Sequence, residues 1–224
     1  RATASAPGAS QRPSTAEVNP AGPTSDTAAL AEGLRVRDGG LAADLGAGSG
    51  GVARFVADGS VRWLMLDVNP ELLALCEIPG AMRVCCDVAR ATSALPAGIA
   101  SVVTANPPYL AAGSARRPVC RTREQARIAG PLALPLFYRA ASHLLEEGGE
   151  FRTIGRPRSL EEMLVTCSAF DMGPFEIQPF GPQGRPASLV RIRALRGARA
   201  ALEILPQKPL PGSGRIEAGG CARV

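Results

Sequence analysis

The sequence lacks the residues that several functions require. It has one histidine, His143, and one lysine, Lys208, against 24 arginines, and its six cysteines show no C-x-x-C spacing. This leaves no ligand set for zinc, so we expect no metal. No stretch approaches about 18 consecutive apolar residues, and residues 1–10 lack the apolar core of a signal peptide. We therefore expect no membrane span and a cytoplasmic protein with reduced thiols.

The remaining composition is that of a globular chain with uneven charge. The 224 residues are 46% hydrophobic, which is enough to bury one core. Residues 1–110 hold 8 basic and 10 acidic side chains, whereas residues 111–224 hold 17 basic and 10 acidic ones. The second half is therefore predicted to meet any polyanionic partner.

The chain is predicted to be one domain between two tails. Residues 1–23 and 211–224 are rich in small and turn-forming residues and have few large apolar side chains, which is typical of disorder. The domain spans residues 24–210. It begins at Thr24, where residues that cap helices precede Leu30 and Leu34.

Short apolar segments alternate with helical ones in this domain. Strands are expected at residues 41–45, 61–67, 82–87, 99–105 and 151–154. Helices are expected at residues 51–57, 71–76 and 134–145, and after a capping box that begins at Ser159. Residues 175–180 and 188–195 lack a helix between them, so they form an antiparallel pair at the sheet edge. The alternation predicts an α/β fold, with a mostly parallel sheet covered on both faces.

The first candidate site is the run DLGAGSG at residues 44–50, directly after a strand. Its glycines let the backbone turn sharply and approach a ligand, and the following helix begins with free N–H groups. The G-x-G-x-G spacing differs from the G-x-G-x-x-G of dinucleotide sites and suits a nucleoside that bears an amino acid. The alternative is a plain turn.

Two acids end the next two expected strands. Asp67 can accept hydrogen bonds from both hydroxyls of a ribose, and Asp87 from an adenine amino group, because open α/β sheets bind ligands at that edge. The alternatives are that Asp67 caps the turn at Asn69-Pro70 and that Asp87 is an ordinary turn acid.

The tetrapeptide NPPY, comprising Asn106, Pro107, Pro108 and Tyr109, follows the fourth expected strand. The prolines fix the backbone so that the Asn106 side-chain oxygen and the Pro107 carbonyl can accept from one planar NH2 group. This frees the nitrogen lone pair for attack on a methyl group, while Tyr109 stacks on the ring. Catalysis then needs positioning and electrostatics rather than a strong base. The alternatives are a rigid turn or a proline-rich peptide ligand.

These motifs, in this order, resemble the class I S-adenosylmethionine-dependent methyltransferases that act on amino or amide nitrogens. More narrowly, three stretches resemble the tRNA1(Val) (adenine-37-N6)-methyltransferase family: TSDTAALAEGLRVRDGGLAADLGAGSG, the run from NPPYL to HLLEEGGEFRTIGRPRSLEEML, and GRPASLVRIRALRGARAALEILPQKPL. The resemblance covers residues 24–210. It implies a Rossmann-like domain with seven strands, one of them antiparallel at the edge.

The resemblance also implies site residues. S-adenosylmethionine would be held by Asp44, Gly46, Ala47, Gly48, Gly50, Asp67, Val68 and Asp87. NPPY would hold the acceptor base. The segment from Asp67 to Asp87 is shorter than the family's, so the pocket for the adenine of the cofactor is expected to differ.

Arginines are expected to meet the acceptor. One group follows NPPY and comprises Arg116, Arg117, Arg121, Arg123 and Arg127. A second surrounds the last expected strand and comprises Arg185, Arg191, Arg193, Arg196 and Arg199. They could track phosphates of tRNA or another nucleic acid, or they could decorate a solvated face.

The predicted function is methyl transfer to N6 of an adenine in tRNA. NPPY is shared with DNA adenine and protein glutamine methyltransferases, so both remain alternatives. A catalytically silent RNA-binding module of the same fold is a third.

Overall fold

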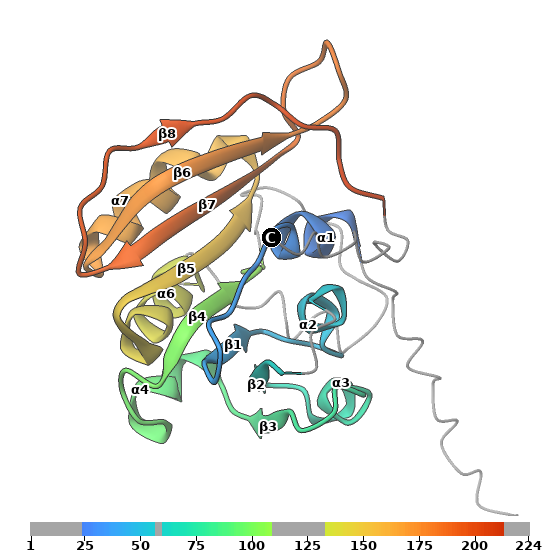
Figure 1. The fold of residues 1–224 in the computed structure, drawn as a ribbon, viewed down its shortest axis with the longest axis vertical. Coiled ribbons are helices and arrows are strands. Elements are labelled where there is room, and N and C mark those ends of the chain that lie inside the picture. The colour runs from blue at the N-terminus through green and yellow to red at the C-terminus, as the bar shows by residue number, and fades with distance from the viewer. Residues whose placement is uncertain (1–23, 57–59, 109–132, 213–224) are drawn as a thin grey trace, which may run out of the picture.

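A computed structural model describes residues 24–56, 60–108 and 133–212. These residues form one sheet of eight strands, in the order β3-β2-β1-β4-β5-β7-β6-β8, with helices packed against it (Figure 1). The strands are β1 (Leu41–Leu45), β2 (Arg62–Asp67), β3 (Met82–Cys85), β4 (Ala100–Ala105), β5 (Leu145–Gly155), β6 (Met172–Phe180), β7 (Leu189–Arg196) and β8 (Glu203–Ile204).

Helices cover both faces of the sheet, as expected. One face carries α1 (Ser25–Ala31), α2 (Gly51–Phe55) and α3 (Pro70–Ala74), and the other carries α4 (Ala91–Ala94), α6 (Ala133–Leu144) and α7 (Leu160–Ala169) (Figure 1). Two short 3-10 turns, η1 (Val88–Arg90) and η2 (Pro157–Ser159), lead into α4 and α7. β1 and β4 are buried along their whole length, as parallel strands between helical layers must be.

The topology brings the predicted motifs to one edge. β1 pairs in parallel with both β2 and β4, and β5 continues the parallel arrangement beyond β4. The chain runs outward from β1 to β3 and then returns to place β4 on the other side of β1. We call the edge where β1, β2 and β4 end the carboxyl edge. Ligands of open α/β sheets bind there, at the point where the strand order reverses.

Apolar side chains fill the two layers. Beneath α6 and α7, Tyr138 packs edge-on against Phe151 at a ring-centre distance of 4.9 Å, and both are fully buried. Beneath α1–α3, Trp63 and Met65 are nearly or fully buried in a cluster that includes Leu30. Each layer buries large apolar side chains, which is the main source of stability for such a fold.

Two members of the second group of arginines, Arg191 and Arg193, are built into the fold, whereas Arg185 and Arg199 are exposed. Arg191 is 5% exposed, donates to the carbonyls of Ala29 and Glu32, and pairs with Glu32 and Glu176. Arg193 pairs with Glu176 at 2.9 Å. The Arg191 guanidinium is therefore not available for phosphates, because a buried cation must keep its partners, while the partly exposed Arg193 is held by its ion pairs.

A third arginine completes this network. Arg152 is 1% exposed, pairs with Glu150, and donates to the carbonyls of Glu32 and Gly33. Burial raises the pKa of Glu150, but the hydrogen bond from Arg193 and the charges of both arginines hold it below its usual value. The network attaches the C-terminal end of α1 to the middle of the sheet. The positive charges of the arginines also stabilise this end of the helix, because a helix C-terminus carries partial negative charge.

Several expected details need correction. The described sheet has eight strands rather than seven, because β8 pairs in parallel with β6. The expected antiparallel pair is confirmed as β6 and β7 on this side of the sheet, where only the two-residue β8 lies beyond them. The Ser159 side chain makes no capping hydrogen bond, because Ser159 ends η2 with φ −98° and ψ 3° rather than with the extended backbone of an N-cap. The expected tail 1–23 and residues 213–224 of the other lie outside the described residues.

Thr24 caps the first described helix, as the sequence predicts. The Thr24 side chain accepts from the Thr27 amide at 3.3 Å. Thr24→Ala should lower the free energy of unfolding by about 1 kcal/mol, because it removes this cap. Thr24→Ser keeps the hydroxyl and should unfold like the parent in urea. Equal stability of all three proteins would argue against the cap.

Candidate functional site

The glycine-rich turn after β1 is fixed to the end of β2. Gly46 and Ala47 donate their amides to the carbonyl of Leu66, at 2.8 and 3.0 Å. Gly46, Gly48 and Gly50 all have positive φ, at 72°, 54° and 84°. Side-chain-bearing residues rarely adopt this conformation, so the glycine spacing follows from the shape of the turn.

Gly50 also lies against a neighbouring side chain. A Cβ added there would come within 2.8 Å of the Cys76 sulfur, whereas one added at Gly48 would meet nothing within 4 Å. Gly50→Ala should therefore lower the free energy of unfolding by about 2–3 kcal/mol, and Gly48→Ala by about 1–2 kcal/mol. Urea unfolding of both variants measures the difference.

A double variant separates crowding from backbone strain. Adding Cys76→Ala to Gly50→Ala removes the sulfur, so the two changes together should cost less than the sum of the single changes. Additive losses would show that the contact between Gly50 and Cys76 does not matter.

Asp67 holds the turn from the end of β2. Its Oδ2 accepts from the Gly48 amide and its Oδ1 from the Asn69 amide, both at 2.8 Å. Asn69 in turn caps α3 through its own side-chain oxygen. The carboxylate therefore organises both loops, and each oxygen keeps a further lone pair with which to accept from a ligand hydroxyl.

Asp44 is a buried acid at the end of β1. Its carboxyl is 3% exposed, and its Oδ1 accepts from the Thr104 hydroxyl at 2.7 Å. Burial raises the pKa of Asp44 to about 7, with a further contribution from Asp67, although the Thr104 hydrogen bond opposes the increase. A cation bound near Asp44 would remove this penalty.

The predicted acceptor motif follows β4 directly. Pro107 is buried, while Asn106 and Pro108 are partly buried. Ala105 aligns with Leu45, the last residue of β1, so Asn106 and the start of the glycine turn follow neighbouring strand ends. Tyr109 lies outside the described residues. The first arginine group, Arg116, Arg117, Arg121, Arg123 and Arg127, also lies outside them.

Two predicted cofactor residues lie farther out on the same edge. Val68 is 50% exposed and offers an apolar surface just after β2. Asp87 is exposed, and its Oδ1 accepts from the Ala89 amide at 2.9 Å, which caps η1. The turn role considered for Asp87 is thus observed, and its second oxygen remains available to a ligand. α3 covers only five residues, in line with the short segment between Asp67 and Asp87.

Thr104 is a polar residue of the site that no motif in the sequence marks. This residue is fully buried in β4 and aligns with Asp44 in β1. A threonine inside an apolar strand is common, since β-branched side chains favour strands. Only the pairing of the two strands reveals its polar partner, Asp44. The one indication in the sequence is that this hydroxyl lies two positions before Asn106.

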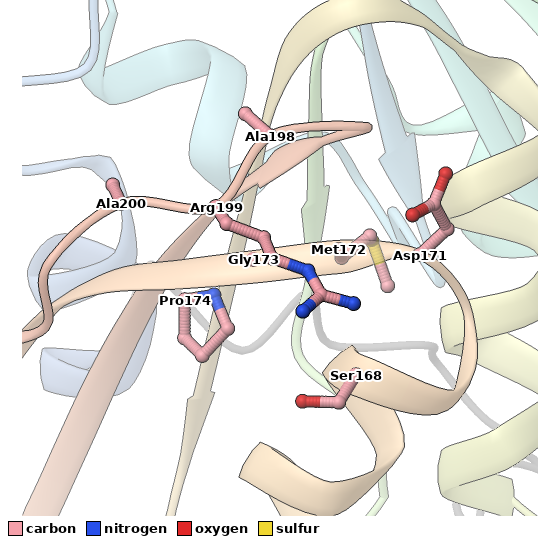
Figure 2. Close-up of a pocket in the computed structure, with 8 residues that line it drawn as sticks. All are labelled: Ser168, Asp171, Met172, Gly173, Pro174, Ala198, Arg199 and Ala200. Atoms are coloured by element: carbon pink, nitrogen blue, oxygen red, sulfur yellow. The ribbon is translucent and has the colours of Figure 1, made fainter.

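A separate hollow lies at the opposite edge of the sheet. It holds about 440 Å³ and lies between the end of α7, the start of β6 and the segment after β7. Figure 2 shows the Arg199 guanidinium extending toward Ser168 and Pro174, with the Asp171 carboxylate directed away. Arg199 belongs to the second arginine group, and none of the residues predicted to bind the cofactor or the acceptor base lines this hollow.

No family model and no curated protein matches the sequence. The fold, however, has solved counterparts. A predicted O-methyltransferase from Agrobacterium tumefaciens shares 24% identity over 80% of this chain and 84% of its own, with a TM-score of 0.64. A TehB-like SAM-dependent methyltransferase from Corynebacterium glutamicum shares 12% over 76% and 87%, with a TM-score of 0.53. The chain has the class I methyltransferase fold.

A third structure with this fold contains a ligand. It is a geranyl diphosphate C-methyltransferase from Streptomyces coelicolor in complex with Mg²⁺, geranyl diphosphate and S-adenosyl-L-homocysteine. It shares 15% identity over 75% of this chain and 80% of its own, with a TM-score of 0.51. In the described part of the present chain, no cluster of three or more potential metal-ligating side chains occurs, and no helix is long and apolar enough to span a membrane.

Proposed function

We propose that this protein transfers a methyl group from S-adenosylmethionine to a planar amino nitrogen. The observation that carries the proposal is the position of Asn106 and Pro107. They directly follow β4, beside the glycine turn that follows β1. A methyl donor at the turn and an acceptor at Asn106 would meet at the carboxyl edge.

The chemistry of the described residues fits this cofactor. The space beside Gly48 is open, so a ligand can approach its backbone. Asp67 has lone pairs for ribose hydroxyls, the exposed Val68 offers a surface for a flat base, and Asp44 provides a carboxyl for an ammonium group. These are the three kinds of group that the cofactor presents.

When bound, S-adenosylmethionine supplies an electrophilic methyl group on a sulfonium. The protein's part is to hold the acceptor nitrogen in line with it. The side-chain oxygen of Asn106 and the carbonyl of Pro107 accept from the two N–H groups of the acceptor, which turns its lone pair toward the methyl group. The nitrogen loses its proton after transfer, so no strong base is needed.

We further propose that the acceptor is N6 of an adenine in tRNA. Support comes from the resemblance of residues 24–210 to tRNA adenine methyltransferases and from the surplus of arginine in the second half. An adenine in a loop is favoured, because an unstacked base costs less to turn into a pocket. A protein glutamine and a DNA adenine present the same planar nitrogen.

Methyl transfer assays separate these candidates. The purified chain with labelled S-adenosylmethionine should label a tRNA pool, and ribonuclease treatment of the pool should abolish the signal. Mass mapping should then find N6-methyladenine. Labelling of DNA or of a glutamine-containing protein instead would move the acceptor to that class. Binding of RNA without binding of S-adenosylhomocysteine would favour the silent module.

A further inference from the structure

We propose that the Thr104 hydroxyl positions Asp44 and sets how readily this carboxyl releases its proton, so that cofactor binding at the glycine turn expels a proton from Asp44. This inference rests on the proposed function, because it assumes a ligand whose ammonium group lies near Asp44. Thr104 is a positioning residue in this scheme, since it acts through Asp44.

The side chains of Asp44 and Thr104 form a buried hydrogen bond between neighbouring strands. Asp44 and Thr104 are aligned partners in the parallel pairing of β1 with β4. Asp44 is 3% exposed and Thr104 is fully buried, and the hydroxyl lies 2.7 Å from Oδ1. The hydroxyl is 3.4 Å from the Ala43 carbonyl, so its shorter contact is the one to Asp44. Water cannot easily replace a donor at this depth.

Charges around the pair favour a proton on Asp44. Asp67, at the end of β2, is the charged group that acts on it among the described residues. The acids of α1 are engaged elsewhere, Asp26 with Arg156 and Glu32 with Arg191. Other charged groups on the adjacent helices are exposed or already hydrogen-bonded. Arg54 of α2 donates to the Leu75 carbonyl, and Glu71 of α3 is exposed. On α6, Arg139 and His143 bond to the carbonyls of Ala89 and Leu95.

The proton balance of binding follows from this environment. In the free protein near neutral pH, about half of the Asp44 carboxyls carry a proton, since burial raises the pKa to about 7. An ammonium group nearby stabilises the carboxylate. The O–H bond of Asp44 then breaks, the carboxylate pairs with the ammonium, and the proton leaves to the buffer. Affinity should therefore rise with pH up to about 7 and level off above it.

Removing the hydroxyl should shift this profile. Thr104→Val keeps the shape of the side chain but removes the bond that favours ionised Asp44. The rise in affinity should move to higher pH, and at pH 7 the dissociation constant should increase about tenfold. Thr104→Ser restores a hydroxyl and should restore the profile. A protein that was only less well folded would bind more weakly at every pH.

The matched control is Ser101→Ala. Ser101 is a second buried hydroxyl of β4, which donates to the Leu41 carbonyl rather than to Asp44. Its removal should leave the pH profile unchanged. Asp44→Asn should flatten the profile below pH 7, because no proton remains to be released. The ammonium of the ligand titrates alike in all variants, so differences between them report on Asp44.

The experiment is calorimetric titration with S-adenosylhomocysteine from pH 5.5 to 8.5, in two buffers with different ionisation enthalpies. We expect the parent to release about half a proton at pH 7 and more at pH 6, and Asp44→Asn to release less at both. Parallel profiles of parent and Thr104→Val, or equal proton release by parent and Asp44→Asn, would overturn the inference alone. A parent that binds no S-adenosylhomocysteine at any pH would overturn the proposed function and this inference with it.

Discussion

Asn106→Ala should slow methyl transfer by about 10²–10³-fold and leave the affinity for S-adenosylhomocysteine within a few-fold of the parent value. Asn106 follows β4, and the cofactor residues follow β1 and β2, so the substitution removes a contact to the acceptor only. The lost hydrogen bond acts on the nitrogen where charge develops during transfer. Removing one such group from an active site costs about 10²–10³-fold in rate.

Two further variants test the role of the side-chain oxygen. Asn106→Asp keeps an acceptor oxygen in place and should keep part of the activity, whereas Asn106→Gln displaces it and should behave like alanine. Single-turnover rates with labelled cofactor measure transfer, calorimetry measures cofactor binding, and urea unfolding checks the fold. A variant Asn106→Ala that transfers methyl groups at the parent rate, or that loses cofactor affinity instead, would contradict the assignment.

The sequence predicts the features of this protein that depend on neighbouring residues. The run at residues 41–45 is the observed β1 to the residue, because an apolar segment between glycines has clear limits. The glycines at 46, 48 and 50 adopt the positive φ values that their spacing suggests. Strand ends then place Asp67 and Asn106 on one edge, since parallel strands end together.

Features that depend on distant partners could not be predicted in the same way. Arg191 and Glu32 lie 159 positions apart, and Asp44 and Thr104 lie 60 apart. An arginine on an expected strand has the same local pattern whether it faces solvent or a buried acid. For this reason the sequence leaves open whether Arg191 and Arg193 meet phosphates or a solvated face, whereas the fold pairs both with acids and uses Arg191 to hold α1. The short β8 has no signal of its own, because two residues carry no periodicity.

The stability of the free protein should depend on pH through Asp44. The usual pKa of an aspartic acid is about 3.8, and burial raises the pKa of Asp44 to about 7 in the folded chain. Below pH 3.8 the carboxyl is neutral in both the folded and the unfolded chain, so it does not lower the free energy of unfolding. Between pH 3.8 and 7 the unfolded chain ionises first, so stability falls by up to about 1.4 kcal/mol per pH unit, and above pH 7 the loss is complete.

Asp44→Asn removes this dependence and supplies the measurement. The variant keeps an oxygen for the Thr104 hydroxyl, so at pH 4 it should unfold in urea much like the parent. At pH 8 it should be more stable by up to about 4 kcal/mol. The exposed Asp38 provides the control, since Asp38→Asn makes the same chemical change outside the core. A stability difference between Asp44→Asn and parent that stays constant from pH 4 to 8 would contradict the assignment.

This result would also explain why an acid occupies a buried position. Asparagine would give a more stable free protein at neutral pH, so stability alone does not favour Asp44. A carboxylate beside Asp67 becomes favourable when a cation enters the site and offsets both the burial and the repulsion. The free energy that Asp44 costs the unliganded fold is thus recovered in the complex, which is the expected design of a binding residue rather than a structural one.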